Sequence, residues 1–321
     1  MKPLSSKEIL IDVHTHIGTD LLFYLQKHYP YAQDWISLVK EGERHGISRF
    51  VVFPMVSHIG LDWNGLCEGK IITGKEAIVP YAFENRRMMV EIQERFPDHA
   101  KKALPLWMVD PSRNPEGQVQ AIRDLNQQYP CVGLKVQATV IQSYIRDFLG
   151  KGGVLLDLAE EKGWPVLIHT SVHPEDPWSC VKDILTVTKS RPRIRFNLAH
   201  SCRFDLAALD QIAELPNAWF DCSAHRIHCQ LAVENHLAVA QGKSRFPSDY
   251  RDPFQVLSDL AERYPTKLMW GSDAPFDSYI DDQMGLKSSY QEEVEVLHRL
   301  EAAVKHRIGY TNTMNFLGLP L

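Results

Sequence analysis

The chain has 321 residues, 44% of them hydrophobic, which is long enough for one large barrel or two medium domains. Its 35 basic and 40 acidic residues give a net charge of -5, so we expect neither nucleic acid nor an anionic membrane as a partner. No apolar run approaches the ~20 residues of a membrane span, and the N-terminus lacks a signal-peptide pattern. The six cysteines form no CxxC pair, which is expected of reduced thiols in a cytoplasmic protein.

Strand-like and helix-like segments alternate along the chain. The predicted strands are 9–14, 49–56, 103–109, 131–137, 165–170, 194–200, 218–223 and 267–272. The predicted helices are 33–45, 82–96, 115–128, 152–162, 178–190, 204–214, 253–264 and 289–306. Eight of each predict an α/β fold, a (β/α)8 TIM barrel, as a single domain over residues 1–321.

Two connections are longer than this pattern needs. Residues 57–80 follow the second predicted strand and residues 224–252 follow the seventh, on the face where barrel active sites lie. We expect the second connection to be either a lid or an oligomer contact.

The first strand ends in the sequence Asp12-Val-His-Thr-His16. Because side chains on a strand alternate, Asp12, His14 and His16 are expected on one face and Ile9, Ile11 and Val13 on the other. Two imidazoles two residues apart at a strand end can bind one metal ion.

Later strands end in residues of the same chemical type. His169 ends 165–170, His200 ends 194–200, and Asp273 follows 267–272. Alternation places each of them on the interior face at the carboxyl end of its strand. On these faces His200 is expected beside Phe196 and Leu198, Asp273 beside Met269 and Gly271, and Lys135 beside Gly133 and Gln137.

These residues predict a catalytic metal site. His14, His16, His169 and Asp273 are the expected ligands of one divalent ion, most simply Zn²⁺, with Mn²⁺ as an alternative. The ion would lower the pKa of a bound water toward ~7. Asp273 would also be the general base, and His200 would lie just outside the ligands and orient the water or donate a proton.

The local sequences around these residues resemble the amidohydrolase superfamily. Ile11-Asp-Val-His-Thr-His-Ile-Gly18, Gly133-Leu-Lys-Val136, Leu198-Ala-His-Ser201, Gly271-Ser-Asp-Ala-Pro275 and Tyr310-Thr-Asn-Thr-Met-Asn-Phe-Leu-Gly318 are similar to its amidohydrolase-related branch, which includes aminocarboxymuconate-semialdehyde decarboxylase and several lactonases. The resemblance covers residues 9 to 319. It implies a TIM barrel, a mononuclear metal held by His14, His16, His169 and Asp273, and His200 as a catalytic neighbour.

Lys135 leaves a second metal arrangement open. In binuclear amidohydrolases a lysine at the end of the fourth strand is carboxylated and bridges two ions, and His169 and His200 would then hold the second ion. Otherwise Lys135 offers positive charge to a substrate carboxylate or pairs with an acidic neighbour.

Four further residues are candidates for substrate binding. Arg203, His173, His225 and Arg226 lie in connections that follow predicted strands. Arginine binds carboxylates bidentately, so Arg203 or Arg226 would suit an acidic substrate, whereas each is otherwise part of an ion pair or a solvated surface.

The sequence therefore predicts a metal-dependent hydrolase that cleaves a small-molecule amide, ester or lactone. The alternative is a metal-dependent, non-oxidative decarboxylase of a small aromatic or muconate-type acid. A non-catalytic binding protein is a third interpretation, opposed by the complete ligand set. The expected partner is a small molecule, with a carboxylate as one option, and a homodimer rests on analogy alone.

Overall fold

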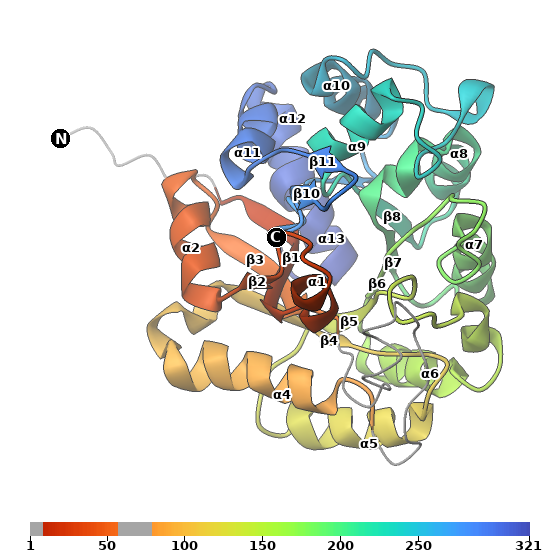
Figure 1. Ribbon diagram of the computed structural model, residues 1–321. Helices are drawn as coiled ribbons and strands as arrows, with labels where there is room; N and C mark the ends of the chain where they lie inside the picture. Colours follow the sequence, from red (N-terminus) through yellow and green to blue (C-terminus); the bar gives the residue numbers. More distant parts are fainter. Residues whose placement is uncertain (1–8, 57–78) are drawn as a thin grey trace.

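The computed structural model describes residues 9–56 and 79–321 (Figure 1). Its centre is a sheet in the order β2-β1-β3-β4-β5-β6-β7-β8-β9, parallel throughout except for the short β2. The strands are β1 (Ile11–Thr19), β2 (Ala32–Gln33), β3 (Arg49–Pro54), β4 (Ala103–Met108), β5 (Gly133–Val136), β6 (Val166–Ile168), β7 (Phe196–Leu198), β8 (Ala218–Asp221) and β9 (Leu268–Met269).

The first and last parallel strands meet and close this sheet into a barrel. Val13 N–H donates to the Trp270 carbonyl at 3.2 Å, and Asp273 N–H donates to the His14 carbonyl at 2.9 Å. A β-carbon at Gly271 would lie 3.0 Å from the His14 β-carbon, so glycine permits this close approach of the two backbones. The predicted eight-stranded TIM barrel is confirmed.

Helices form a ring around the strands in Figure 1. The α-helices are α1 (Leu21–Leu25), α2 (Trp35–Arg44), α4 (Ala82–Met89), α5 (Pro115–Asn126), α6 (Gly153–Lys162), α7 (Val181–Ser190), α8 (Leu206–Glu214), α9 (His225–Val233), α10 (Pro253–Arg263), α11 (Tyr290–His298), α12 (Ala302–His306) and α13 (Asn312–Leu317). The predicted helix 82–96 continues from α4 as a π-helix, η1 (Val90–Arg95), and the predicted helix 289–306 is divided into α11 and α12. A small hairpin, β10 (Tyr279–Ile280) and β11 (Gly285–Leu286), follows the last barrel strand.

The core has two layers. An inner cluster fills the barrel and includes Val13, Val51, Leu106, Leu167 and Met269. An outer cluster packs the strands against the helices and includes Phe50, Trp107, Leu134, Phe196 and Leu257. Lys135 lies between two residues of the outer cluster, Leu134 and Val136, and so points into the barrel as predicted.

A bulge in β1 corrects the predicted faces of that strand. Asp12 pairs with Phe50 and Thr15 pairs with Val52, so β1 contains one residue more than β3 between these pairs. Because of this extra residue, the adjacent residues Val13 and His14 both point into the barrel. The prediction that Asp12 shares a face with His14 and His16 is wrong, because the extra residue reverses the alternation.

The predicted neighbours of His200 also need correction. Phe196 and Leu198 belong to the outer cluster and not to the interior face. His200 turns inward because the backbone changes direction directly after β7, where every residue from His200 to Phe204 has a positive φ. The sequence carries no glycine there to indicate such a turn.

The two long connections differ in what the structure reveals. Most of the first, residues 57–78, lies outside the described residues. The second, 224–252, contains α9. His225, Arg226 and His228 therefore lie on a helix, whereas the sequence predicted no helix in this connection. In the parts of the chain that are described, no helix combines the length and apolar character needed to cross a membrane.

Candidate active site

Three imidazoles meet one carboxylate at the carboxyl end of the barrel. His14 Nε2 lies 3.2 Å and His16 Nε2 lies 3.3 Å from Asp273 Oδ1, and His200 Nδ1 lies 3.8 Å from Asp273 Oδ2. One ligand atom each from His14, His200 and Asp273 falls within 4.8 Å of the others, and all three residues are buried. We call His14, His16, His200 and Asp273 the His–Asp cluster.

The fold brings this cluster together from three distant parts of the sequence. His14 and His16 come from β1, His200 follows β7, and Asp273 follows β9. Asp273 has a φ of 69°, so its carboxylate is held over the barrel by a backbone conformation that non-glycine residues seldom adopt.

His169 borders the cluster on one side. It follows β6, and its Nδ1 lies 2.9 Å from His200 Nε2. Its other nitrogen, Nε2, accepts a hydrogen bond from Arg203 Nη2 at 3.1 Å. The predicted ligand His169 and the predicted neighbour His200 are thus in direct contact, with His200 nearer to Asp273.

Lys135 borders the cluster on another side. Its Nζ lies 3.1 Å from His14 Nε2 and 4.8 Å from the centre of the Phe53 ring. Burial lowers the pKa of Lys135 to about 8, although Asp273 and Asp221 favour its charged form. The lysine expected in this region therefore reaches the site, in contact with a predicted metal ligand.

Asp221 is a site residue that sequence reasoning missed. It ends β8 with its side chain buried, and its Oδ2 accepts hydrogen bonds from His14 Nδ1 at 3.1 Å and from Asn197 Nδ2 at 2.7 Å. Burial alone would raise the pKa of Asp221, but His14 and Ser223 outweigh it and hold that pKa below its usual range. Its position two residues before the end of the predicted strand 218–223 was the available signal.

Ser223 links Asp221 to two imidazoles. Its Oγ lies 3.1 Å from His14 Nδ1 and 2.8 Å from His200 Nδ1. A carboxylate and a hydroxyl behind the ligating rings fix their orientation and tautomer, an arrangement common in metal sites.

The imidazoles of the site are held neutral. Burial is the main cause that lowers the pKa of His14, His16 and His200, and the positive charges of Lys135 or Arg203 lower it further. Burial also raises the pKa of Asp273 to about 6, against the opposing effect of His14 and Lys135. Neutral imidazole nitrogens that converge on a carboxylate oxygen fit a divalent ion such as Zn²⁺ or Mn²⁺.

A cavity of about 370 Å³ opens beside the cluster and has the size of a small-molecule site. Its polar lining includes His16, His169, Arg203, His228 and Asp273, together with Asp20, Gln137, Thr139, His236, Ser278 and Asp281. The apolar wall includes Phe23, Val56, Val140, Ile227, Leu231, Phe276, Tyr279, Met284 and Leu286.

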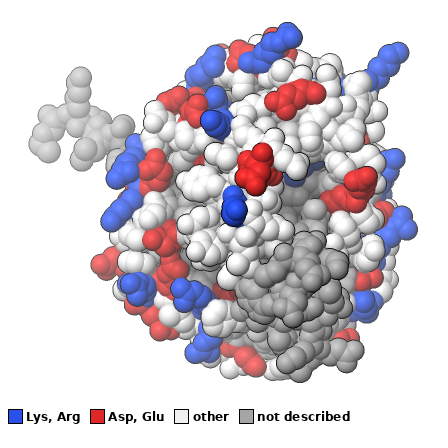
Figure 2. Space-filling view, in the orientation of Figure 1, with Lys and Arg blue, Asp and Glu red and all other residues white. Residues whose placement is uncertain are grey.

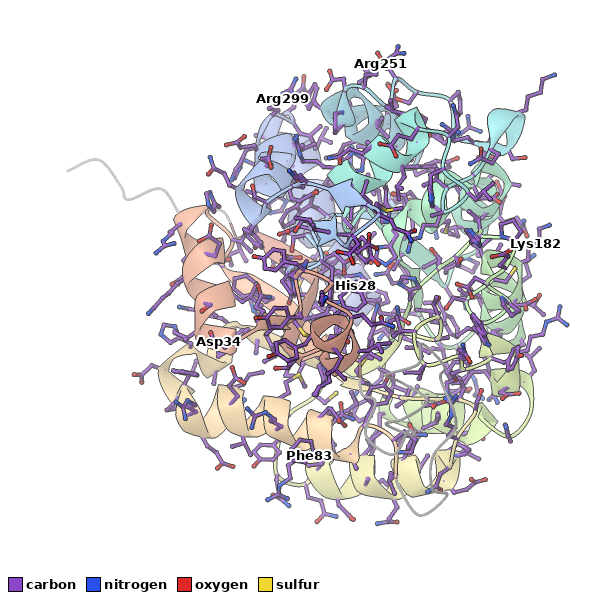
Figure 3. The ribbon with its side chains drawn as sticks, viewed as in Figure 1. His28, Asp34, Phe83, Lys182, Arg251 and Arg299 are labelled. Atoms are coloured by element: carbon purple, nitrogen blue, oxygen red, sulfur yellow. The ribbon has the colours of Figure 1, made fainter. Side chains whose placement is uncertain are left out.

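The surface around this face is mixed in charge. In Figure 2, acidic and basic side chains are interspersed around the rim, and uncharged residues dominate the centre of the drawn face. His28, labelled in Figure 3, lies beside α1 near the middle of the view, and its ring centre is 5.2 Å from that of Phe23 in the cavity wall.

Three predicted substrate-binding residues do not line this cavity in the described part of the chain. His173 accepts a hydrogen bond from Glu175 N–H at 3.2 Å within its own connection. His225 donates to the Pro253 carbonyl at 2.7 Å, and Arg226 forms an ion pair with Glu292 of α11 at 2.9 Å. Arg203 is the arginine of the predicted pair that reaches the cavity.

Comparisons with known proteins agree with this architecture. A family model described as amidohydrolase matches residues 70–319. The comparison with curated proteins gave no significant match.

Solved structures share the fold at low sequence identity. An amidohydrolase from Burkholderia multivorans with bound HEPES has a TM-score of 0.63 at 15% identity, covering 97% of this chain and 100% of its own. A 2,6-dihydroxybenzoate decarboxylase complexed with 2,6-dihydroxybenzoate has a TM-score of 0.59 at 13% identity, covering 97% and 98%. Dihydroorotase from Campylobacter jejuni has a TM-score of 0.56 at 11% identity, covering 100% and 88%. Since the family match extends over most of the sequence and the barrel carries the His–Asp cluster at its mouth, the chain belongs to the amidohydrolase family.

Proposed function

We propose that the protein is a metal-dependent hydrolase that cleaves an amide, ester or lactone bond of a small molecule. The observation that carries this proposal is the His–Asp cluster, which is buried at the carboxyl end of the barrel and opens into a cavity of about 370 Å³. Several relatives by fold are named as hydrolases, among them a dihydroorotase and a beta-aspartyl dipeptidase.

The residues have distinct proposed roles. One divalent ion, Zn²⁺ or Mn²⁺, would be held by His14, His16 and Asp273. The fourth ligand would be one of two adjoining rings, His169 or His200. Such an ion supplies Lewis-acid polarisation of a carbonyl oxygen and lowers the pKa of water. A carboxylate oxygen of Asp273 accepts the proton of the attacking water, and the other ring of the His169–His200 pair donates a hydrogen bond to the substrate.

The protein also orients and shields the reacting groups. Asp221 and Ser223 hold the His14 ring from behind, and the apolar wall of the cavity limits access of bulk water. Lys135 is proposed as a positive charge near a developing oxyanion in the mononuclear arrangement, or as a carboxylated bridge in a binuclear one.

The first test compares the wild-type protein, loaded with Zn²⁺ or Mn²⁺, with the Asp273→Asn variant. Hydrolysis of a panel of aryl esters and lactones is followed by proton release, and hydrolysis of N-acyl amides by detection of the amine product. Because Asp273 is proposed as both ligand and base, the variant should lose activity by about 10²- to 10⁴-fold in kcat on any substrate found. Asp210→Asn is the control, since this carboxylate of α8 pairs with Arg263 on the surface.

A second candidate function is supported by the aromatic residues of the cavity. Phe23, Phe276 and Tyr279 form one connected wall, which suits a planar ring, and one relative by fold is named as a 2,6-dihydroxybenzoate decarboxylase. The same protein incubated with a panel of aromatic acids would then release carbon dioxide. Release of carbon dioxide without hydrolysis of any ester, lactone or amide would replace the first proposal by this one, and full activity of Asp273→Asn would refute the role given to that residue.

A further inference from the structure

Arg203 brings a positive charge into the cavity wall. Its Nε donates to the Thr170 carbonyl at 2.9 Å, Nη2 donates to His169 Nε2 at 3.1 Å, and Nη1 contacts His228 Nε2. A guanidinium group has five N–H donors, so these contacts leave two for a ligand.

Within the described residues no carboxylate forms a direct ion pair with Arg203, although the negative charges of Asp273, Asp176 and Asp221 offset part of the lowering of its pKa that burial causes. The ion pairs found there do not include Arg203, and its two side-chain partners, His169 and His228, are imidazoles that carry no negative charge. A guanidinium removed from water without an anionic partner is costly unless a ligand supplies the negative charge. Arg226, in contrast, is already paired with Glu292.

Much of the remaining lining of this cavity is aromatic and aliphatic. The Phe276 ring centre lies 5.1 Å from that of His16 and 5.5 Å from that of Phe23, and Phe23 lies 5.7 Å from Tyr279. Ile227, Leu231 and Leu286 extend this surface. The lining also includes the carboxylates Asp20 and Asp281, so a ligand that fills the cavity meets the Arg203 guanidinium, an apolar wall, the His–Asp cluster and these two acidic side chains.

We propose that the substrate is a small carboxylic acid whose carboxylate is bound by the free N–H groups of Arg203 while its apolar body packs against the wall around Phe276. This inference rests on the proposed function, because it takes the reacting bond to lie beside the His–Asp cluster. Arginine binds a carboxylate through two parallel hydrogen bonds, which fixes its orientation as well as its position. The cavity volume of about 370 Å³ limits the ligand to a compact acid.

The probe for this site is benzoate, with benzamide as its uncharged counterpart of nearly equal shape. Affinities are measured by isothermal titration calorimetry on the metal-loaded protein. We expect the wild type to prefer benzoate, and Arg203→Gln to weaken benzoate binding by about 10- to 100-fold, as for loss of a charged hydrogen bond, without a change in benzamide binding.

Two more variants keep the test interpretable. Arg203→Lys retains the charge but not the planar fork, so its benzoate affinity should fall between wild type and Arg203→Gln, and it carries the test if Arg203→Gln does not fold. Arg263→Gln is the matched control, because this arginine pairs with Asp210 on the outer surface and should bind benzoate as wild type does.

Equal affinity of the wild type for benzoate and benzamide would overturn the inference, as would undiminished benzoate binding by folded Arg203→Gln. The Asp273→Asn variant separates this inference from the proposed function. Benzoate affinity that falls in Asp273→Asn but not in Arg203→Gln would place the carboxylate at the His–Asp cluster and refute only the role of Arg203. Unchanged hydrolysis by Asp273→Asn, with the benzoate preference still dependent on Arg203, would refute only the proposed mechanism.

Discussion

A single buried carboxylate, Asp221, connects several residues of the site. Its Oδ2 accepts from His14 Nδ1, and its Oδ1 accepts from the backbone N–H groups of His200 and Ser223 at 3.1 and 3.0 Å. The hydrogen bond to His14 Nδ1 leaves Nε2 of the same ring as the nitrogen that faces Asp273. Asp221 therefore positions His14 without itself facing the cavity.

Asp221→Asn should weaken metal binding while leaving the His–Asp cluster in place. An amide in this position no longer offers a negative charge to His14 and can present an N–H group to it, so the ring loses its fixed tautomer. We expect metal affinity to fall about 10- to 100-fold, the usual cost of losing a partner behind a ligand. Competition with a chromophoric chelator measures it.

Asp210→Asn serves again as the surface control in this titration, and circular dichroism checks the fold of both variants. Metal affinity that is equal in Asp221→Asn and in wild type would show that Asp221 does not position His14.

At the scale of elements, the alternation of strands and helices was predictable because it depends on local patterns. All eight barrel strands begin within two residues of their predicted beginnings, and β1 extends beyond its predicted end to Thr19. The bulge in β1 was not predictable, because it depends on the pairing with β3. The inward turn of His200 was equally hidden, since five successive residues with positive φ are held by tertiary contacts and not by glycine.

Helix α9 was also missed, and its first residue carries a pH-dependent contact. His225 donates from Nε2 to the Pro253 carbonyl at the start of α10, and burial lowers the pKa of His225 to about 4. An unfolded histidine has a pKa near 6.5, so the unfolded chain binds more protons between these two values. The contribution of His225 to the free energy of unfolding is therefore complete above about pH 6.5. It is lost as the pH falls toward 4, by about 3 kcal/mol for this lowering of the His225 pKa.

His225→Gln should flatten this dependence. Urea unfolding at a series of pH values between 4 and 7.5 gives the free energy of unfolding of each protein, and the slope for the variant should be smaller than that for the wild type. His298→Gln is the control, because His298 is exposed and donates to the His45 carbonyl at the surface. Identical slopes for wild type and His225→Gln would show that His225 is not the group responsible.

At the scale of the whole molecule, the site exists only when the barrel is closed. His14 and His16 come from the first strand, Asp273 follows the last, and the backbone hydrogen bond from Asp273 to the His14 carbonyl is part of the seam between them. The sequence predicted which residues are candidates for this site, since each falls at the end of a predicted strand. It did not predict Asp221, Ser223 or His228, whose roles depend on distances across the closed barrel.

This arrangement would couple metal binding to the stability of the entire fold. An ion held by His14 and His16 of β1 and by Asp273 after β9 would bind the folded chain and not the unfolded one, so it should stabilise the protein by about 2.7 kcal/mol at a free concentration of 100 Kd. Treatment with a chelator should therefore lower Tm by about 4 °C, and added Zn²⁺ or Mn²⁺ should restore it. Scanning calorimetry measures the change, and Asp273→Asn provides the control, because its Tm should respond little to either treatment.

Elemental mass spectrometry of the same samples gives the number of ions per chain. One ion per chain supports binding by His14, His16 and Asp273 with one ring of the His169–His200 pair. Two ions per chain, falling to one or none in Lys135→Ala, would instead assign Lys135 as a carboxylated bridge, in which the two carbamate oxygens would be the ligands. A protein that binds no ion after reconstitution, and whose Tm does not respond, would refute the metal site itself.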